Sequence, residues 1–386
     1  MITLNTTDAL AAFCKRAAQG PYVTVDTEFL RERTYYAKLC LVQLALPGTD
    51  TEIDAVLVDP LAGDMDLTPL YELFRNEKVV KVFHAARQDL EIFYIEGNVL
   101  PRPLFDTQVA AMVCGFGEQV GYETLVRRIT RQPLDKTSRF TDWSRRPLSD
   151  AQKTYALADV THLRQIYETL AAELKKTKRT KWVEEELAGL LAPETYVIDP
   201  EVAWQRVKTR TNSGKFLAVV RELAKFREHH AQSHNVPRSR VFKDDALLEL
   251  ASTKPGSVKD LGRSRLLMRE ARKGEIADGI LKAVQAGLAC PPEEQPVPDK
   301  SRDRLQINAA LADLLRVLLK AKSEQAGVAQ KLVATAAELD LIASGIRDVP
   351  ALGGWRKEVF GSDAIRLCEG KVALTANGSS VALIDI

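Results

Sequence analysis

Residues 21–29 read PYVTVDTEF, an alternating run that is rich in β-branched and aromatic residues and has two acids near its end. Such residues favour a pleated, half-buried backbone, so the run predicts a β-strand. Asp26 and Glu28 are two positions apart, which places both carboxylates on the same face of that strand. Two anionic groups this close are unfavourable unless a cation neutralises them, although a solvated strand edge can carry the same pattern.

Strands and helices alternate on both sides of this run. Further strands are predicted at residues 38–46, 55–60 and 79–84. One helix is predicted at residues 7–18, and three more are predicted to start at Thr68, directly after residue 84 and at Asp106. Thr68, ahead of Pro69, and Asp106 are expected to cap their helices. Ser149 and Gln152 predict a capping box that opens a long helix over about residues 150–176. The alternation predicts an α/β domain with a mixed sheet and flanking helices.

The remainder of the chain has helical periodicity and is divided by proline-containing segments. LAPETYVIDP (191–200) and CPPEEQPVPDK (290–300) are expected to be boundaries. We therefore predict four segments, namely 1–190, 200–288, a proline-rich linker at 289–300, and 301–386. Asn377-Gly378, between two alternating apolar runs, predicts a β-hairpin at the end of the chain.

Charge is distributed unevenly along the 386 residues. The whole chain carries a net charge of +2, but residues 201–290 hold 18 Lys and Arg against 10 Asp and Glu, a net of +8. Such a basic helical segment indicates a polyanionic partner, with a merely solvated helical surface as the alternative. No apolar stretch is long enough to predict a membrane-spanning helix. Five scattered cysteines without a CxxC motif favour a reducing, cytoplasmic location.

Three further residues extend the acidic pattern. Asp89 lies in the first turns of the helix that follows residues 79–84, and Tyr155 and Asp159 are four residues apart on one helix face. Taken singly, each acid could be an ordinary surface residue and the tyrosine an ordinary core residue. Taken together, the carboxylates form a set of hard oxygen ligands, which favour Mg²⁺ or Mn²⁺ over zinc.

Three stretches resemble the bacterial ribonuclease D family. They are VDTEFLRERTYYAKLCLVQLA (25–45), VFHAARQDLEIF (82–93) and LDKTSRFTDWSRRPLSDAQKTYALADVTHL (134–163). The family belongs to the DEDD superfamily of 3′→5′ exonucleases, in the subgroup with a tyrosine in its third motif. The resemblance implies a ribonuclease H-like α/β exonuclease domain followed by two all-α, HRDC-like helical bundles, the second more divergent. HRDC domains are small helical nucleic-acid-binding modules.

The resemblance assigns roles to five residues. It implies that Asp26, Glu28, Asp89 and Asp159 bind two divalent cations, Mg²⁺ or Mn²⁺, and that Tyr155 orients the attacking water. Hydrolysis would then release nucleoside 5′-monophosphates from RNA 3′ ends, with tRNA precursors as the expected partner and 3′ maturation of tRNA as the expected process. A DNA-directed 3′→5′ exonuclease is the alternative enzyme, and a non-catalytic nucleic-acid-binding scaffold is the alternative from another class. We expect a monomer.

Weaker signals suggest where the nucleic acid would lie. Thr27, Phe29 and His84 are candidates for contacts to the terminal nucleotide. Arg139 and Trp143 belong to a segment in which basic and aromatic residues alternate, a composition suited to single strands. Each signal has an alternative explanation. Phe29 could pack within the sheet, and His84 could be a hydrogen-bonded histidine at the start of a helix. The basic segment could be a loop held by salt bridges to nearby acids.

Overall fold

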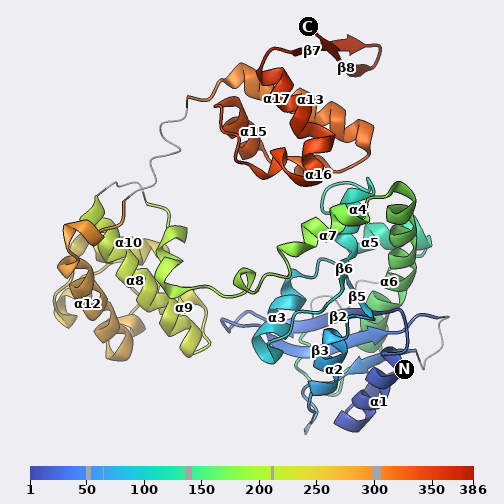
Figure 1. Ribbon diagram of the computed structural model, residues 1–386. Helices are drawn as coiled ribbons and strands as arrows, with labels where there is room; N and C mark the ends of the chain where they lie inside the picture. The colour runs from blue at the N-terminus through green and yellow to red at the C-terminus, as the bar shows by residue number, and fades with distance from the viewer. Residues whose placement is uncertain (49–53, 64, 135–140, 210–212, 298–305) are drawn as a thin grey trace. The chain divides into compact units, whose positions relative to one another are not determined.

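The computed structural model describes residues 1–48, 54–63, 65–134, 141–209, 213–297 and 306–386. The chain forms two compact units (Figure 1). One comprises Met1–Glu28, Leu41–Ala192 and Ser301–Ile386, and the other comprises Phe29–Cys40 and Pro193–Lys300. Among the described residues, no helix combines the length and the apolar character needed to cross a membrane.

A six-stranded mixed sheet organises the N-terminal part of the chain (Figure 1). Its strands follow the order β1 (Ile2–Leu4), β4 (Ala55–Val58), β3 (Lys38–Ala45), β2 (Tyr22–Leu30), β5 (Val80–Phe83) and β6 (Leu104–Asp106). Strand β4 is antiparallel to β3 and parallel to β1, whereas β5 is parallel to both β2 and β6. The prediction of an α/β domain with a mixed sheet is therefore confirmed.

The apolar content of the strands explains why the sheet is central. Residues 39–45 of β3 are all buried, as are the four residues of β4. Buried runs of this kind, which are apolar here except for Gln43, occur in strands covered on both faces. The short outer strands β1 and β6 were not predicted, because three residues are too few to show a periodic pattern.

Helices surround the sheet and begin largely where the sequence indicates. They are α1 (Thr7–Ala17), α2 (Thr68–Arg75), α3 (Arg87–Gly97), α4 (Thr107–Val113), α5 (Tyr122–Leu125), α6 (Asp150–Thr177) and α7 (Thr180–Ala188). Asp106 accepts hydrogen bonds from the backbone N–H of Gln108 and Val109, and both halves of the Ser149–Gln152 capping box are present. These two predicted caps are confirmed.

The predicted cap at Thr68 is wrong. Thr68 is the first residue of α2, and the N-cap position is Leu67, whose side chain makes no capping hydrogen bond. The carboxylate of Asp66 instead accepts hydrogen bonds from the backbone N–H of Thr68 at 2.9 Å and from its hydroxyl at 2.7 Å. The acid that precedes the N-cap position therefore provides the oxygen that was expected from Thr68.

The part of the second unit that follows Ala192 is helical where the structure describes it. It contains α8 (Gly214–Ser233), α9 (Arg238–Val241), α10 (Asp244–Thr253), α11 (Val258–Leu261) and α12 (Gly274–Ala289), preceded by a 3₁₀ segment at Pro200–Arg206. Helices α8 and α12 approach closely, since a Cβ on Gly287 would lie 2.5 Å from the Cα of Val219 and one on Gly279 would meet the ring of Phe226. Because higher numbers on one helix match lower numbers on the other, the two helices are antiparallel.

The C-terminal part packs on α4 and α7 within the first unit. It contains α13 (Ala309–Ala326), α14 (Gln330–Val333), α15 (Ala336–Ala343), α16 (Gly354–Arg356) and α17 (Ser362–Cys368). The rings of Trp182 and Trp355 stack with their centroids 4.6 Å apart, and the indole N–H of Trp355 donates to Glu186 at 2.9 Å. The backbone N–H of Ala329 donates to the carbonyl oxygen of Met112 at 3.0 Å.

A two-stranded hairpin ends the chain. Strands β7 (Val372–Asn377) and β8 (Ser380–Asp385) are antiparallel, and Asn377 pairs with Ser380. The predicted hairpin is confirmed, with Gly378 and Ser379 as its loop residues. The C-terminal part is thus helical except for this hairpin, and the four-segment division of the chain stays a prediction.

Candidate active site

Strand β2 presents two carboxylates on one face. Asp26 and Glu28 are half-buried, while Thr27 between them points to the other side and is only 5% exposed. Oxygen atoms of Asp26, Glu28 and Asp159 all lie within 4.8 Å of one another. Three carboxylates from two distant segments therefore converge on one point, whereas the alternation along the strand predicts only that Asp26 and Glu28 share a face.

Helix α6 contributes the third carboxylate together with a phenol. Asp159 is buried, and the hydroxyl of Tyr155, one turn earlier, is hydrogen-bonded to its carboxylate. Burial, followed by the negative charges of Asp159, Glu28 and Asp26, raises the pKa of Tyr155. The phenol is therefore protonated at neutral pH and can act as a hydrogen-bond donor.

Helix α3 holds the fourth carboxylate in its first turn. The helix begins at Arg87, two residues after Ala85, whose backbone is left-handed with φ +56°. Asp89 is 6% exposed, and the hydroxyl of Thr27 donates a hydrogen bond to it. Among the described residues, Asp89 is not part of the group of three carboxylates, but its charge acts on Asp26.

The electrostatics of this cluster favour a bound cation. Burial raises the pKa of Asp26 well above its ordinary value, with further contributions from Asp159, Asp89 and Glu28. Burial likewise raises the pKa of Asp89 to about 7. Buried like charges are unfavourable in a metal-free protein, and a divalent cation among them would reverse this effect. The all-oxygen ligand set suits Mg²⁺ or Mn²⁺, so the residues present fit such ions.

A cavity of about 290 Å³ opens beside the carboxylates. Asp26, Tyr155 and Asp159 line it together with His84 and Tyr122. Tyr122, which the sequence did not indicate, donates its hydroxyl hydrogen bond to the backbone carbonyl oxygen of Asp159 at 2.6 Å. It lies in no recognisable motif, so only its folded position connects it with the site.

His84 forms part of the cavity wall. Its Nδ1 lies 3.0 Å from the hydroxyl oxygen of Thr107, and its ring lies 5.4 Å from that of Tyr122. Burial lowers the pKa of His84, against an opposing effect from Asp106, so a neutral ring faces the cavity. A neutral imidazole in this position can donate or accept a hydrogen bond.

The other suggested nucleic-acid contacts have different outcomes. Trp143 is 2% exposed, and its ring lies 6.1 Å from that of Tyr155. The Trp143 ring therefore has no open face in this structure, and its contact with nucleic acid stays a prediction. The side chain of Thr27 is engaged with Asp89, and Phe29 is half-buried on β2. Arg139 lies outside the described residues.

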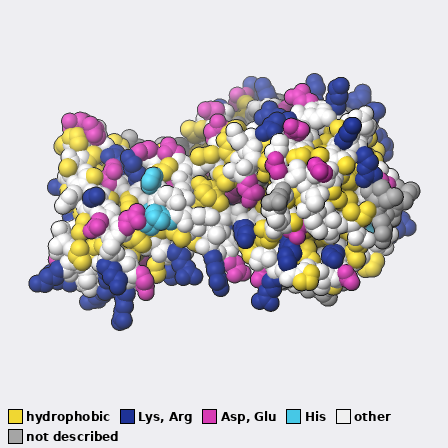
Figure 2. All heavy atoms as spheres, turned by 90° about the horizontal axis from the view of Figure 1, so that it is seen from below, with side chains coloured by type: hydrophobic (Ala, Val, Ile, Leu, Met, Phe, Trp, Pro, Cys, Tyr) yellow, Lys and Arg dark blue, Asp and Glu magenta, His cyan; other side chains and the backbone are white. Residues whose placement is uncertain are grey.

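Basic side chains in the second unit are partly neutralised by acids. Arg238 pairs with Glu228 at 2.6 Å, and Arg227 pairs with Asp244 at 2.7 Å. On the face drawn in Figure 2, Lys and Arg side chains are spread over many places among acidic and hydrophobic ones. Ion pairs within the unit therefore offset part of the net charge of this segment.

Comparisons with known proteins agree with this geometry. A family model described as 3′-5′ exonuclease matches residues 1–175, and one described as HRDC domain matches residues 216–284. The chain is 66% identical over 384 residues to ribonuclease D of Jannaschia sp., covering 100% of this chain and 99% of that protein. It is 48% identical over 386 residues to ribonuclease D of Nitrobacter hamburgensis, covering 100% of both.

A solved structure extends the similarity to the whole fold. Escherichia coli RNase D, described as an exoribonuclease involved in structured RNA processing, matches with a TM-score of 0.80 and 28% sequence identity. The match covers 95% of this chain and 98% of that one. Sequence identity and fold thus agree along nearly the full length. The chain belongs to the ribonuclease D family of hydrolytic 3′→5′ exoribonucleases.

Proposed function

We propose that Asp26, Glu28, Asp89 and Asp159 bind two divalent cations, Mg²⁺ or Mn²⁺, at which RNA is hydrolysed from its 3′ end. The convergence of the oxygens of Asp26, Glu28 and Asp159 within 4.8 Å carries this proposal. When bound, the cations supply an activated water and neutralise charge on the leaving 3′ oxygen. The raised pKa of Asp26 and Asp89 supports the need for positive charge at this place.

Each side chain then has a definite task. The charge of Asp26 interacts with each of the other three acids, and Asp26 would help to hold both cations. Glu28 and Asp159 would hold the cation that supplies the attacking water, and Asp89 would help to hold the cation that neutralises the leaving oxygen. The hydrogen bond from Thr27 holds the Asp89 carboxylate in place. Tyr155 would orient the water with its hydroxyl, because its raised pKa makes it a donor and not a base.

The substrate we propose is RNA with a free 3′ end, in the form of structured precursors such as those of tRNA. The description of the similar E. coli protein as acting in structured RNA processing supports this class. The matched HRDC domain supplies a second nucleic-acid-binding surface on a segment of net charge +8. We propose that the protein acts as a monomer in the cytoplasm.

Labelled RNA and DNA oligonucleotides of the same sequence, and a tRNA carrying a 3′ extension, test this proposal. We expect nucleoside 5′-monophosphates to be released from the 3′ end of RNA in Mg²⁺, and release to stop in excess EDTA and resume when Mg²⁺ or Mn²⁺ is restored. Release that persists in EDTA would contradict the metal assignment. Faster release from DNA than from RNA would favour the DNA-directed alternative, and no release from either would favour the scaffold.

Replacement of Tyr155 by Phe tests the positioning role. The variant removes only the hydroxyl that is bound to Asp159, so we expect kcat to fall by about 10²-fold. Divalent-ion affinity should change little, since the four carboxylates are intact, and titration calorimetry with Mn²⁺ measures it. Tyr167→Phe is the matched control, because Tyr167 packs against Tyr22 and Phe105 and does not line the cavity. Equal turnover of Tyr155→Phe and wild type would refute the role.

A further inference from the structure

Three of the five histidines of the chain lie within six residues of helix α8 and its C-terminal end. His229, His230 and His234 belong to the sequence HHAQSH. His230 and His234 are four residues apart and therefore lie on the same helix face. His229 is exposed and lines a groove that Glu275 also lines. Histidine side chains also gather at the surface near acidic side chains on the face drawn in Figure 2.

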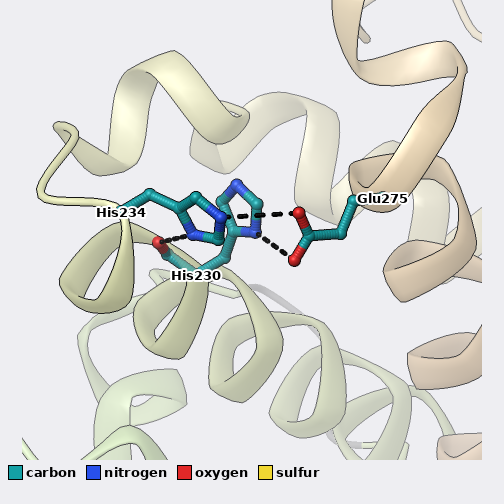
Figure 3. Close-up of side chains that lie close together, drawn as sticks. All are labelled: His230, His234 and Glu275. Atoms are coloured by element: carbon teal, nitrogen blue, oxygen red, sulfur yellow. Dashed lines mark hydrogen bonds and ion pairs between the residues drawn. The ribbon is translucent and has the colours of Figure 1, made fainter.

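A carboxylate from a neighbouring helix meets this pair (Figure 3). Glu275 is in the first turn of α12, and it faces the end of α8 because the two helices are antiparallel and in close contact. One carboxylate oxygen lies 3.4 Å from Nε2 of His234, and the other lies 3.8 Å from Nδ1 of His230. All three ligand atoms lie within 4.8 Å of one another.

The separation between Glu275 and His234 matches that between ligands of a small transition-metal ion. Two ligands on a tetrahedral zinc, with bonds of about 2.0–2.1 Å, lie about 3.4 Å apart. The two imidazole rings are stacked with centroids 4.0 Å apart and planes inclined by 19°, so one ring must turn before both nitrogens point at a single ion. His230 is 9% exposed and is held against Phe226, which fixes its ring direction.

The Nδ1 atom of His234 has two partners at the same distance. It lies 3.1 Å from the carbonyl oxygen of His230 and 3.1 Å from the hydroxyl oxygen of Ser233. When the proton is on Nδ1, the ring donates to the carbonyl oxygen and Nε2 presents a lone pair toward the carboxylate of Glu275. A metal-bound histidine typically donates its other N–H to a backbone carbonyl, and this tautomer provides that arrangement.

We propose that His230, His234 and Glu275 form a binding site for a divalent transition-metal ion of the zinc type, separate from the nuclease site. Two imidazoles and one carboxylate are a common ligand set for zinc, and water would complete the coordination. The ion would join the last turns of α8 to the first turn of α12. It would therefore stabilise the helical unit against separation of these two helices.

The test must separate this site from the nuclease carboxylates. The full-length chain carrying Asp26→Asn and Asp159→Asn serves as the background, because those changes remove two ligands of the proposed nuclease cations. Elemental analysis after equilibrium dialysis measures the amount of bound zinc. When Co²⁺ replaces zinc, its visible absorption spectrum shows whether the ion is coordinated by nitrogen and oxygen atoms. We expect one equivalent of zinc and a Co²⁺ spectrum in this background.

Further substitutions in the same background locate the ion. His234→Ala and Glu275→Gln are each expected to lose the zinc equivalent and the Co²⁺ absorption, whereas His229→Ala, at the adjacent exposed position, is expected to keep both. His234 and Glu275 are 46% and 69% exposed, so their replacement should leave thermal unfolding in EDTA unchanged. Absence of zinc from the background protein would overturn the proposal and would show that Glu275 and the histidines form an ion pair without a metal. An equal loss of zinc in His229→Ala would overturn the assignment of the ligands.

Discussion

Asp26→Asn is expected to lower the rate of RNA hydrolysis by about 10³-fold or more in Mg²⁺ buffer. Asp26 belongs to the group whose oxygens lie within 4.8 Å, and its charge interacts with each of the other three acids. Loss of its anionic oxygen weakens the binding of both proposed cations, which removes about 4 kcal/mol of transition-state stabilisation. Single-turnover release of labelled mononucleotide from an RNA 3′ end measures the effect.

The control for this variant is an acid on the same helix as Asp159. Asp150→Asn changes an exposed carboxylate in the first turn of α6, which pairs with Lys153 at 3.7 Å. We expect near wild-type hydrolysis from it. RNA binding by catalytically impaired Asp26→Asn should persist, since the HRDC domain is intact. Near-normal turnover by Asp26→Asn in Mg²⁺ would show that the carboxylate cluster is not the catalytic centre.

Asp89→Asn is expected to make the metal-free protein more stable at pH 8 and to change its stability little at pH 4. Burial raises the pKa of Asp89 from its ordinary value of 3.8 to about 7. The native state therefore binds a proton that the unfolded state releases, so wild-type stability falls as pH rises from about 4 to about 7. The full shift corresponds to on the order of 4 kcal/mol, and asparagine, which is uncharged, avoids this cost.

Urea unfolding in EDTA at several pH values measures this difference between wild type and variant. The amide oxygen introduced by Asp89→Asn can still accept the hydrogen bond from Thr27, so the comparison isolates the charge.

Asp66→Asn is the contrasting control, because hydrogen bonds from Thr68 lower the pKa of that exposed carboxylate. The stability that the Asp66 carboxylate contributes is present above the ordinary pKa of an aspartate and is lost as pH falls. Mg²⁺ should stabilise wild type more than Asp89→Asn. A difference between wild type and Asp89→Asn that is constant with pH would contradict the assignment.

Local sequence signals were sufficient for the elements that carry the proposed catalytic residues. The alternating run at residues 21–29 predicted β2, and the Ser149–Gln152 pair predicted the start of α6 at Asp150. Spacings of two on a strand and four on a helix also placed Asp26 beside Glu28 and Tyr155 beside Asp159. These predictions succeeded because side-chain direction within one element depends only on local backbone geometry.

Contacts between distant segments could not be obtained in this way. The burial of Trp143, the hydrogen bond from Tyr122 to the backbone of Asp159, and the joining of His230 and His234 by Glu275 all require separate elements to pack together. The cap of α2 by Asp66 was also missed, because several nearby oxygens compete for one N–H and their order depends on the path of the chain.

The amino-acid order thus established the strand and helix that present the acids, and the family resemblance established which acids to consider. The meeting of Asp26 and Glu28 with Asp159, and the contact of Thr27 with Asp89, arise only when β2, α3 and α6 are assembled. The physical reason is that periodicity encodes which face of an element is buried, whereas the partner of that face is selected by packing over the whole chain.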